Sequence, residues 1–177
     1  MLGFDFEVLP TRVEENHTGS GEPAEQAEQL ARLKAEDVAG TRKQGIRIGA
    51  DTVVVIDGRL LNKPSSDAEA LEMLQSLRGR WHLVHTGIAL HDLATRRTLA
   101  AVETTEVRFA HWDDGVLRRY VQTGEPADKA GAYAIQGLGA MLVQEIRGCY
   151  YNVMGFPVGR FLALLHQLRE PEVGRAR

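Results

Sequence analysis

Apolar residues recur along this chain at two spacings, one typical of strands and one typical of helices. Residues 4–8 alternate between apolar and polar side chains, which predicts a strand stopped by Pro10. Residues 23–38 have apolar side chains at the spacing of one buried face of a helix, and Pro23 suits a first helical turn, so a helix is predicted here. Residues 46–56 are apolar on both faces, which predicts a central strand.

Local signals divide the rest of the chain into further elements. Asp57 and Gly58 predict a tight hairpin turn, and Ser66 with Glu69 forms a capping box for a helix that ends near Gly79. We expect strands at 82–90, 98–109 and 141–146, helices at 116–121 and 157–168, and a tail at 170–177. Strands and helices around a long central strand predict one α/β or α+β domain over residues 1–177.

The composition narrows the classes of function. The 21 basic and 24 acidic side chains give a formal net charge of -3, which argues against a surface that coats nucleic acid. Cys149 is the only cysteine, so neither an internal disulfide nor a cysteine-based zinc site can form. No apolar run approaches the roughly 18 residues of a membrane span, and no signal peptide is recognisable. We therefore expect a cytoplasmic protein with no membrane or nucleic-acid partner.

Asp51 is the most informative polar position, because it lies inside the apolar strand 46–56. A carboxylate there must be paired, bound to a metal or raised in pKa. It is either a functional carboxylate or a structural one that caps a loop or holds a buried lysine. Lys34 falls within the apolar stripe of its helix, so it either extends to solvent or meets an anion.

Other candidates are less specific when taken one by one. Glu14 and Glu15 are adjacent loop acids, which are either solvated or metal-binding, and Lys63 before Pro64 has the features of a surface lysine. The loop 124–131 is dense in turn-forming and charged residues, as both functional loops and plain turns are. Gln136 is either a structural amide or a reader of a base edge.

Two histidines are a weak candidate for a metal site. His82 and His85 are three positions apart, so in a strand they point to opposite faces, which is poor spacing for joint zinc binding. The sequence contains no Walker loop, dinucleotide fingerprint or Ser-His-Asp set.

Taken together, several segments resemble the Maf family of nucleotide pyrophosphatases. The order and spacing match from residue 2 to about 168. The matching segments include Gly49-Ala50-Asp51-Thr52, Asn62-Lys63-Pro64, Asp128-Lys129-Ala130-Gly131, Ile135-Gln136-Gly137 and Tyr151-Asn152-Val153-Met154-Gly155. The resemblance implies an α/β fold related to inosine-triphosphate pyrophosphatases, with a mixed sheet, flanking helices and two lobes around a central cleft.

The resemblance also implies an activity and a set of site residues. It implies hydrolysis of a nucleoside triphosphate to the monophosphate and pyrophosphate, a divalent cation such as Mg²⁺ or Mn²⁺, and a homodimer. Asp51 would be the general base and, with Glu15, would hold the metal. Lys34, Lys63, Asp128 and Lys129 would bind the phosphates, and Thr52 and Gln136 would determine a preference for dTTP and UTP.

The start of the chain departs from the family pattern. The family opens with a strand, a Ser-x-Ser-Pro-Arg-Arg loop and a helix, of which on the order of 20 residues are expected to be missing here. A misplaced start codon or a genuine truncation would explain this. The missing arginine loop leaves open a catalytically impaired nucleotide-binding or regulatory protein. A second alternative is a 7-methyl-GTP pyrophosphatase, the other substrate subgroup of the family.

Overall fold

A five-stranded sheet in the order β2-β1-β3-β4-β5 runs the length of the molecule. The computed structural model describes residues 3–14, 21–37 and 43–170. The strands are β1 (Ile46–Ile56), β2 (Arg59–Leu61), β3 (Trp81–Asp92), β4 (Thr98–Phe109) and β5 (Val143–Arg147). The helices are α1 (Pro23–Asp37), α2 (Asp67–Leu77), α3 (Asp114–Val121), α4 (Tyr150–Val153) and α5 (Val158–Arg169), with 3-10 turns η1 (Glu125–Asp128), η2 (Ala130–Ala132) and η3 (Gly137–Leu142).

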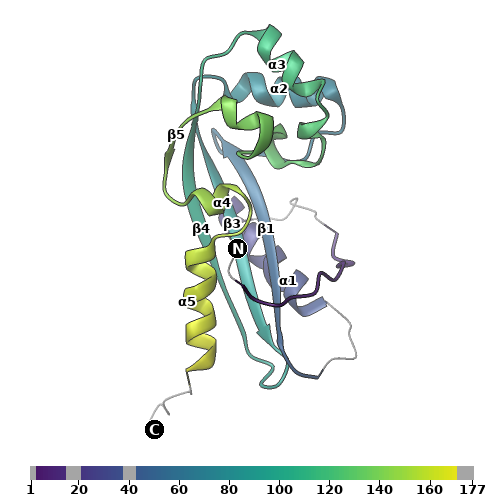
Figure 1. The fold of residues 1–177 in the computed structure, drawn as a ribbon, viewed down its shortest axis with the longest axis vertical. Coiled ribbons are helices and arrows are strands. Elements are labelled where there is room, and N and C mark those ends of the chain that lie inside the picture. The colour runs from purple at the N-terminus through teal and green to yellow at the C-terminus, as the bar shows by residue number, and fades with distance from the viewer. Residues whose placement is uncertain (1–2, 15–20, 38–42, 171–177) are drawn as a thin grey trace.

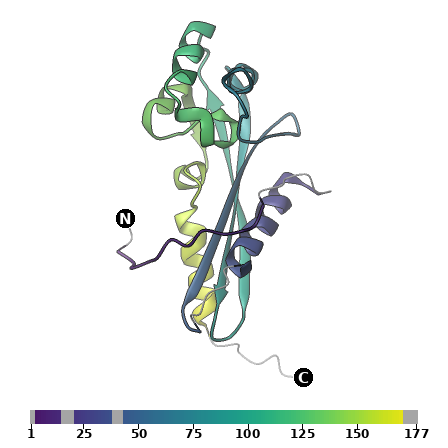
Figure 2. The same cartoon turned by 90° about the vertical axis from the view of Figure 1, so that its right-hand side faces the viewer.

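The elements form two lobes that share the three long strands (Figure 1). At one end, α2, α3 and the 3-10 turns pack on the sheet around a core that includes Leu74, Phe109 and Tyr120. At the other end, α1 and α5 cover opposite faces of the sheet (Figure 2). The helix α5 buries Phe161 and Leu164 against β3 and β4. We call these the helical lobe and the α1 lobe.

Small residues let α1 approach the sheet backbone unusually closely. Ala27, Ala31 and Ala35 are each 0% exposed, and they face glycines of β1 and β3. A Cβ atom at Gly49 would lie 2.1 Å from the carbonyl oxygen of Ala31, and one at Gly87 would lie 2.2 Å from that of Ala27. Because these glycines have no side chain, the helix rests directly on the strands.

Most of the predicted elements are confirmed, including the helix beginning at Pro23, the capping of α2 by Ser66 and the strand Thr98–Phe109. The α/β class with flanking helices is also confirmed. The expected mixed sheet differs, since all four strand pairs among the described residues are antiparallel. The β1–β2 hairpin and α2 return the chain to the end of the sheet where β1 finishes, so β3 runs back along β1.

The predicted strand at 4–8 is wrong. Residues 3–14 carry no regular secondary structure, and Phe6 and Val8 are each 81% exposed. Thr11 and Arg12 instead hydrogen-bond to the carboxylate of Asp37. No described strand pairs with this segment, and of its alternating apolar residues Phe4 lies edge-on to Phe161 of α5, with ring centroids 6.1 Å apart. Most of the predicted tail, residues 171–177, lies outside the described residues.

In the described part of the chain, every helix is too short or too polar to traverse a lipid bilayer.

Candidate active site

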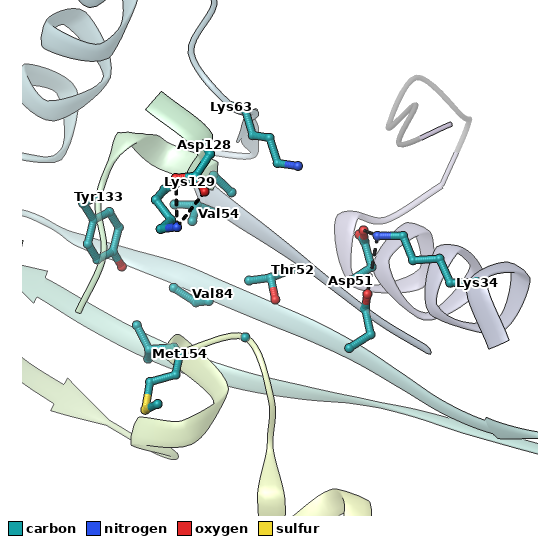
Figure 3. A pocket seen from close by; sticks show the side chains of 14 residues that line it. Lys34, Asp51, Thr52, Val54, Lys63, Val84, Asp128, Lys129, Tyr133 and Met154 are labelled. Carbon is teal, nitrogen blue, oxygen red and sulfur yellow. Dashed lines mark hydrogen bonds and ion pairs between the residues drawn. The ribbon is translucent and has the colours of Figure 1, made fainter. Parts of the chain in front are cut away.

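A cavity of about 240 Å³ lies where the two lobes meet (Figure 3). Residues from β1, α1, the loop after β2, the segment around η2 and the turn after α4 line it. Six of the residues predicted from the sequence are brought together here: Lys34, Asp51, Thr52, Lys63, Asp128 and Lys129.

On the α1 side of the cavity, Asp51 and Lys34 form a buried ion pair. Asp51 is 5% exposed, and the Nζ atom of Lys34 lies 2.7 Å from its Oδ1 atom. Lys34 Nζ also donates to the carbonyl oxygen of Ala50 at 3.4 Å. The close packing of α1 on Gly49 brings this lysine within reach of β1. The lysine in the apolar stripe therefore meets an anion rather than extending to solvent.

On the helical-lobe side, Asp128 and Lys129 form a second pair beside Lys63 (Figure 3). Lys129 Nζ lies 2.8 Å from Oδ1 of Asp128. The hydrogen bond from Lys129 lowers the pKa of Asp128, and the charge of Lys63 adds to this effect. Three lysines and two carboxylates thus surround one cavity, which suits a ligand with several negative charges and an associated cation.

A third wall comes from the turn that follows α4, a segment that carries the family resemblance but was given no role in the site. Met154 and Gly155 line the cavity next to Thr52. Asn152 of α4 fixes the start of this turn. Its side chain is 0% exposed, and its Nδ2 donates to Val84 O and to Thr105 Oγ1, each at 3.0 Å. The signal available in the sequence was Thr86, a polar residue within the mostly apolar run 83–90 that needs a polar partner if it is buried.

The two histidines His82 and His85 form hydrogen bonds to neighbouring hydroxyl groups. His82 Nε2 lies 2.8 Å from the hydroxyl of Tyr133, a cavity residue, and His85 Nδ1 lies 2.9 Å from Thr104 Oγ1. Burial lowers the pKa of His82 to about 4, so its ring is neutral at pH 7. Within the described ranges no three His, Cys, Asp or Glu side chains gather as a metal site.

Two predicted site residues are not placed at this cavity. Gln136 is exposed and does not line it. The 3-10 turn η3, which follows Gln136, is held by Glu125, which accepts hydrogen bonds from the backbone N–H groups of Leu138 and Gly139. Glu15 lies outside the described residues.

The fold and the cavity define an α/β protein whose two lobes enclose a cavity lined by lysines and aspartates. A model of the family described as Maf-like protein matches residues 1–168, and the chain belongs to this family.

Relatives named dTTP/UTP pyrophosphatase cover nearly the whole chain. The protein of Ruminiclostridium cellulolyticum is 46% identical over 166 residues, which is 93% of this chain and 86% of the relative. That of Thermococcus gammatolerans is 49% identical over 166 residues, covering 94% of this chain and 85% of the relative. That of Dictyoglomus thermophilum is 43% identical over 170 residues, covering 94% and 87%. The chain is therefore a nucleoside triphosphate pyrophosphatase of the Maf family.

Proposed function

We propose that the chain hydrolyses dTTP and UTP between the α- and β-phosphates, releasing the monophosphate and pyrophosphate. The observation that carries this assignment is the buried carboxylate of Asp51 in a cavity bordered by three lysines. The names of the relatives support the pyrimidine substrates.

In this proposal Asp51 accepts the proton of the water that attacks the α-phosphorus. A carboxylate next to the reacting phosphate can supply a contribution of roughly 10²–10⁴-fold in this role. Lys34, Lys63 and Lys129 contact the phosphate oxygens and offset the charge that develops on them. Asp128 orients Lys129, whose Nζ it holds at 2.8 Å.

The carboxylates of the cavity fit a divalent cation. Mg²⁺ binds through one or two carboxylates together with substrate phosphates and waters, so a cluster of three protein ligands is not required. Asp51 lines the cavity and, with Glu15, would hold the ion, while Asp128 faces the same space. The cation would polarise the phosphoryl oxygens and orient the triphosphate.

The test of this function is pyrophosphate release from a panel of triphosphates. We expect turnover of dTTP and UTP with Mg²⁺ or Mn²⁺, loss of turnover in EDTA and recovery when the metal is restored. A preference for 7-methyl-GTP would assign the other substrate. Nucleotide-induced thermal stabilisation without any turnover would instead indicate a binding protein.

Lys63 offers a test of the phosphate contacts, because its exposed side chain borders the cavity without being part of a core. We expect Lys63→Met to lower kcat/KM for dTTP about 10-fold, mainly through KM, since a charge-assisted hydrogen bond to phosphate is lost. Lys43→Met is the matched control, because Lys43 is an exposed lysine away from the cavity. Equal effects of the two substitutions would show that only the overall charge matters.

We further propose that the chain acts as a homodimer in the cytoplasm, as the family resemblance implies. Light scattering on the purified protein tests the dimer, and a monomer at micromolar concentration would contradict it.

A further inference from the structure

A short chain of hydrogen bonds connects Thr52, at the cavity wall, to the protein interior. Thr52 in β1 and Thr86 in β3 are directly opposite each other in the sheet, and their Oγ1 atoms are 2.9 Å apart. Thr86 is 0% exposed, and its Oγ1 lies 3.0 Å from the backbone carbonyl oxygen of Asn152. Thr52 is half-buried and lines the cavity.

The direction of these bonds follows from the number of protons. The carbonyl oxygen of Asn152 can only accept, so the single hydroxyl proton of Thr86 is used in that bond. In the contact between the two threonines, Thr86 therefore accepts and Thr52 donates. With its only proton directed inward, the hydroxyl of Thr52 offers lone pairs and no donor to the cavity.

The carbonyl that fixes this direction is itself held rigidly. Asn152 is buried, and its Nδ2 atom donates to both Val84 O and Thr105 Oγ1. The same Thr105 Oγ1 accepts from the N–H of Cys149 and donates to the carbonyl oxygen of Cys149. The short helix α4 is thus anchored to β3 and β4, and the carbonyl of Asn152 cannot rotate away from Thr86 without breaking several buried bonds.

The space beside Thr52 is also open to a ligand. Gly155 borders the cavity, and a Cβ atom there would lie 3.4 Å from Thr52 Oγ1. The backbone of Gly155 has φ +95°, a conformation that favours glycine, so this position stays without a side chain.

We propose that Thr86 is a positioning residue for base selection: by accepting a hydrogen bond from the Thr52 hydroxyl, it makes Thr52 a hydrogen-bond acceptor for the ring N3–H of uracil or thymine. This inference rests on the proposed function. Cytosine has no hydrogen at N3 and presents a lone pair there, which faces the lone pairs of Thr52 unfavourably. The hydrogen-bond direction set in the interior thereby favours UTP and dTTP over CTP and dCTP.

The test compares kcat/KM for UTP and CTP in matched variants. In Thr86→Val the Thr52 hydroxyl loses its acceptor and can turn to donate to N3 of cytosine. We expect the UTP/CTP ratio to fall about 10-fold, the worth of one hydrogen bond. Thr86→Ser keeps the hydroxyl and is expected to keep the ratio within about 2-fold.

Thr105→Val is the control for a small movement of α4, because it removes one anchor of Asn152 but leaves the Asn152 Nδ2 bond to Val84 O and the bond between Thr52 and Thr86. We expect its UTP/CTP ratio to match that of the unmodified protein. An unchanged ratio in folded Thr86→Val would overturn the proposal, as would an equal fall in Thr105→Val. If Thr86→Val does not fold, Thr52→Val replaces it. Thr52 is the half-buried member of the hydrogen-bonded chain, and this substitution removes the hydroxyl that would accept the bond from the base. An unchanged UTP/CTP ratio in Thr52→Val would overturn the proposal in the same way.

The outcomes distinguish this inference from the proposed function. Turnover of UTP with a ratio that ignores Thr86 refutes the inference alone. If the unmodified protein turns over no triphosphate, the proposed function fails, and the inference is then decided by calorimetric dissociation constants for UMP and CMP in the same variants. A lower UMP/CMP preference in Thr86→Val supports it, and an unchanged preference overturns it.

Discussion

Replacing Asp51 with asparagine is expected to lower kcat for pyrophosphate release from dTTP by about 10²–10⁴-fold. The amide cannot accept the proton of the attacking water, and it cannot supply a charged ligand to the cation. The fold should persist, because the amide oxygen can still accept the hydrogen bond that Lys34 Nζ makes to this side chain at 2.7 Å. Steady-state kinetics at saturating dTTP with Mg²⁺ measure the effect, and circular dichroism checks the fold.

Asp57→Asn is the matched control for this substitution. Asp57 lies at the turn after the same strand, where it accepts hydrogen bonds from Arg80 at 2.6 and 2.7 Å, and it does not line the cavity. Its kcat is expected to stay within about 2-fold, since exposed ion pairs contribute little. If Asp51→Asn retained most of the turnover, another group would have to be the base.

Gly87→Ala is expected to destabilise the protein by about 3 kcal/mol, seen as a fall in Tm of roughly 6–12 °C. The added Cβ would lie 2.2 Å from the carbonyl oxygen of Ala27 and 2.6 Å from the backbone nitrogen of Glu28. These are backbone atoms of α1, so the whole helix must move away from the sheet. Gly87 is directly opposite Asp51 in the strand pairing, so this movement also carries Lys34 away from Asp51.

The control is Gly159→Ala in α5, where no atom beyond the neighbouring residues and the backbone of α5 itself lies within 4 Å of the new methyl group. Because alanine stabilises a helix relative to glycine, we expect an unchanged or higher unfolding free energy, by up to about 1 kcal/mol. Differential scanning calorimetry compares the two variants. A Tm of Gly87→Ala equal to that of the control would mean that α1 tolerates a wider spacing.

Local sequence patterns predict much of the fold because they reflect which side chains are covered. The stripe that predicts α1 is the set of alanines and leucines buried on the sheet, and the lysine within it does meet an anion. The apolar run at 46–56 predicts a central strand, which β1 is. The pairing of Asp51 with Lys34 was one of the interpretations that this pattern left open.

Other features depend on contacts that no local pattern contains. The alternation at 4–8 shows that a strand there would have one apolar and one polar face. It does not show whether a neighbouring strand exists to pair with it, and in the structure Phe6 is exposed. The period-two alternation of side chains is the same in parallel and antiparallel strands, so it does not predict strand direction. Asn152 bonds to Val84 and Thr105, which are 68 and 47 positions away, so its role emerges only when the strands are assembled.

The three long strands determine how the two lobes on either side of the cleft are connected. β1, β3 and β4 each contribute side chains to the cores of both lobes, as Val84 and Ile88 do within β3. A hinged enzyme joins two rigid bodies by a short flexible connection, whereas here the connection is a hydrogen-bonded sheet. A change in the separation of the lobes therefore requires this sheet to bend. The width of the cleft is therefore set by the stiffness of a continuous sheet rather than by a hinge.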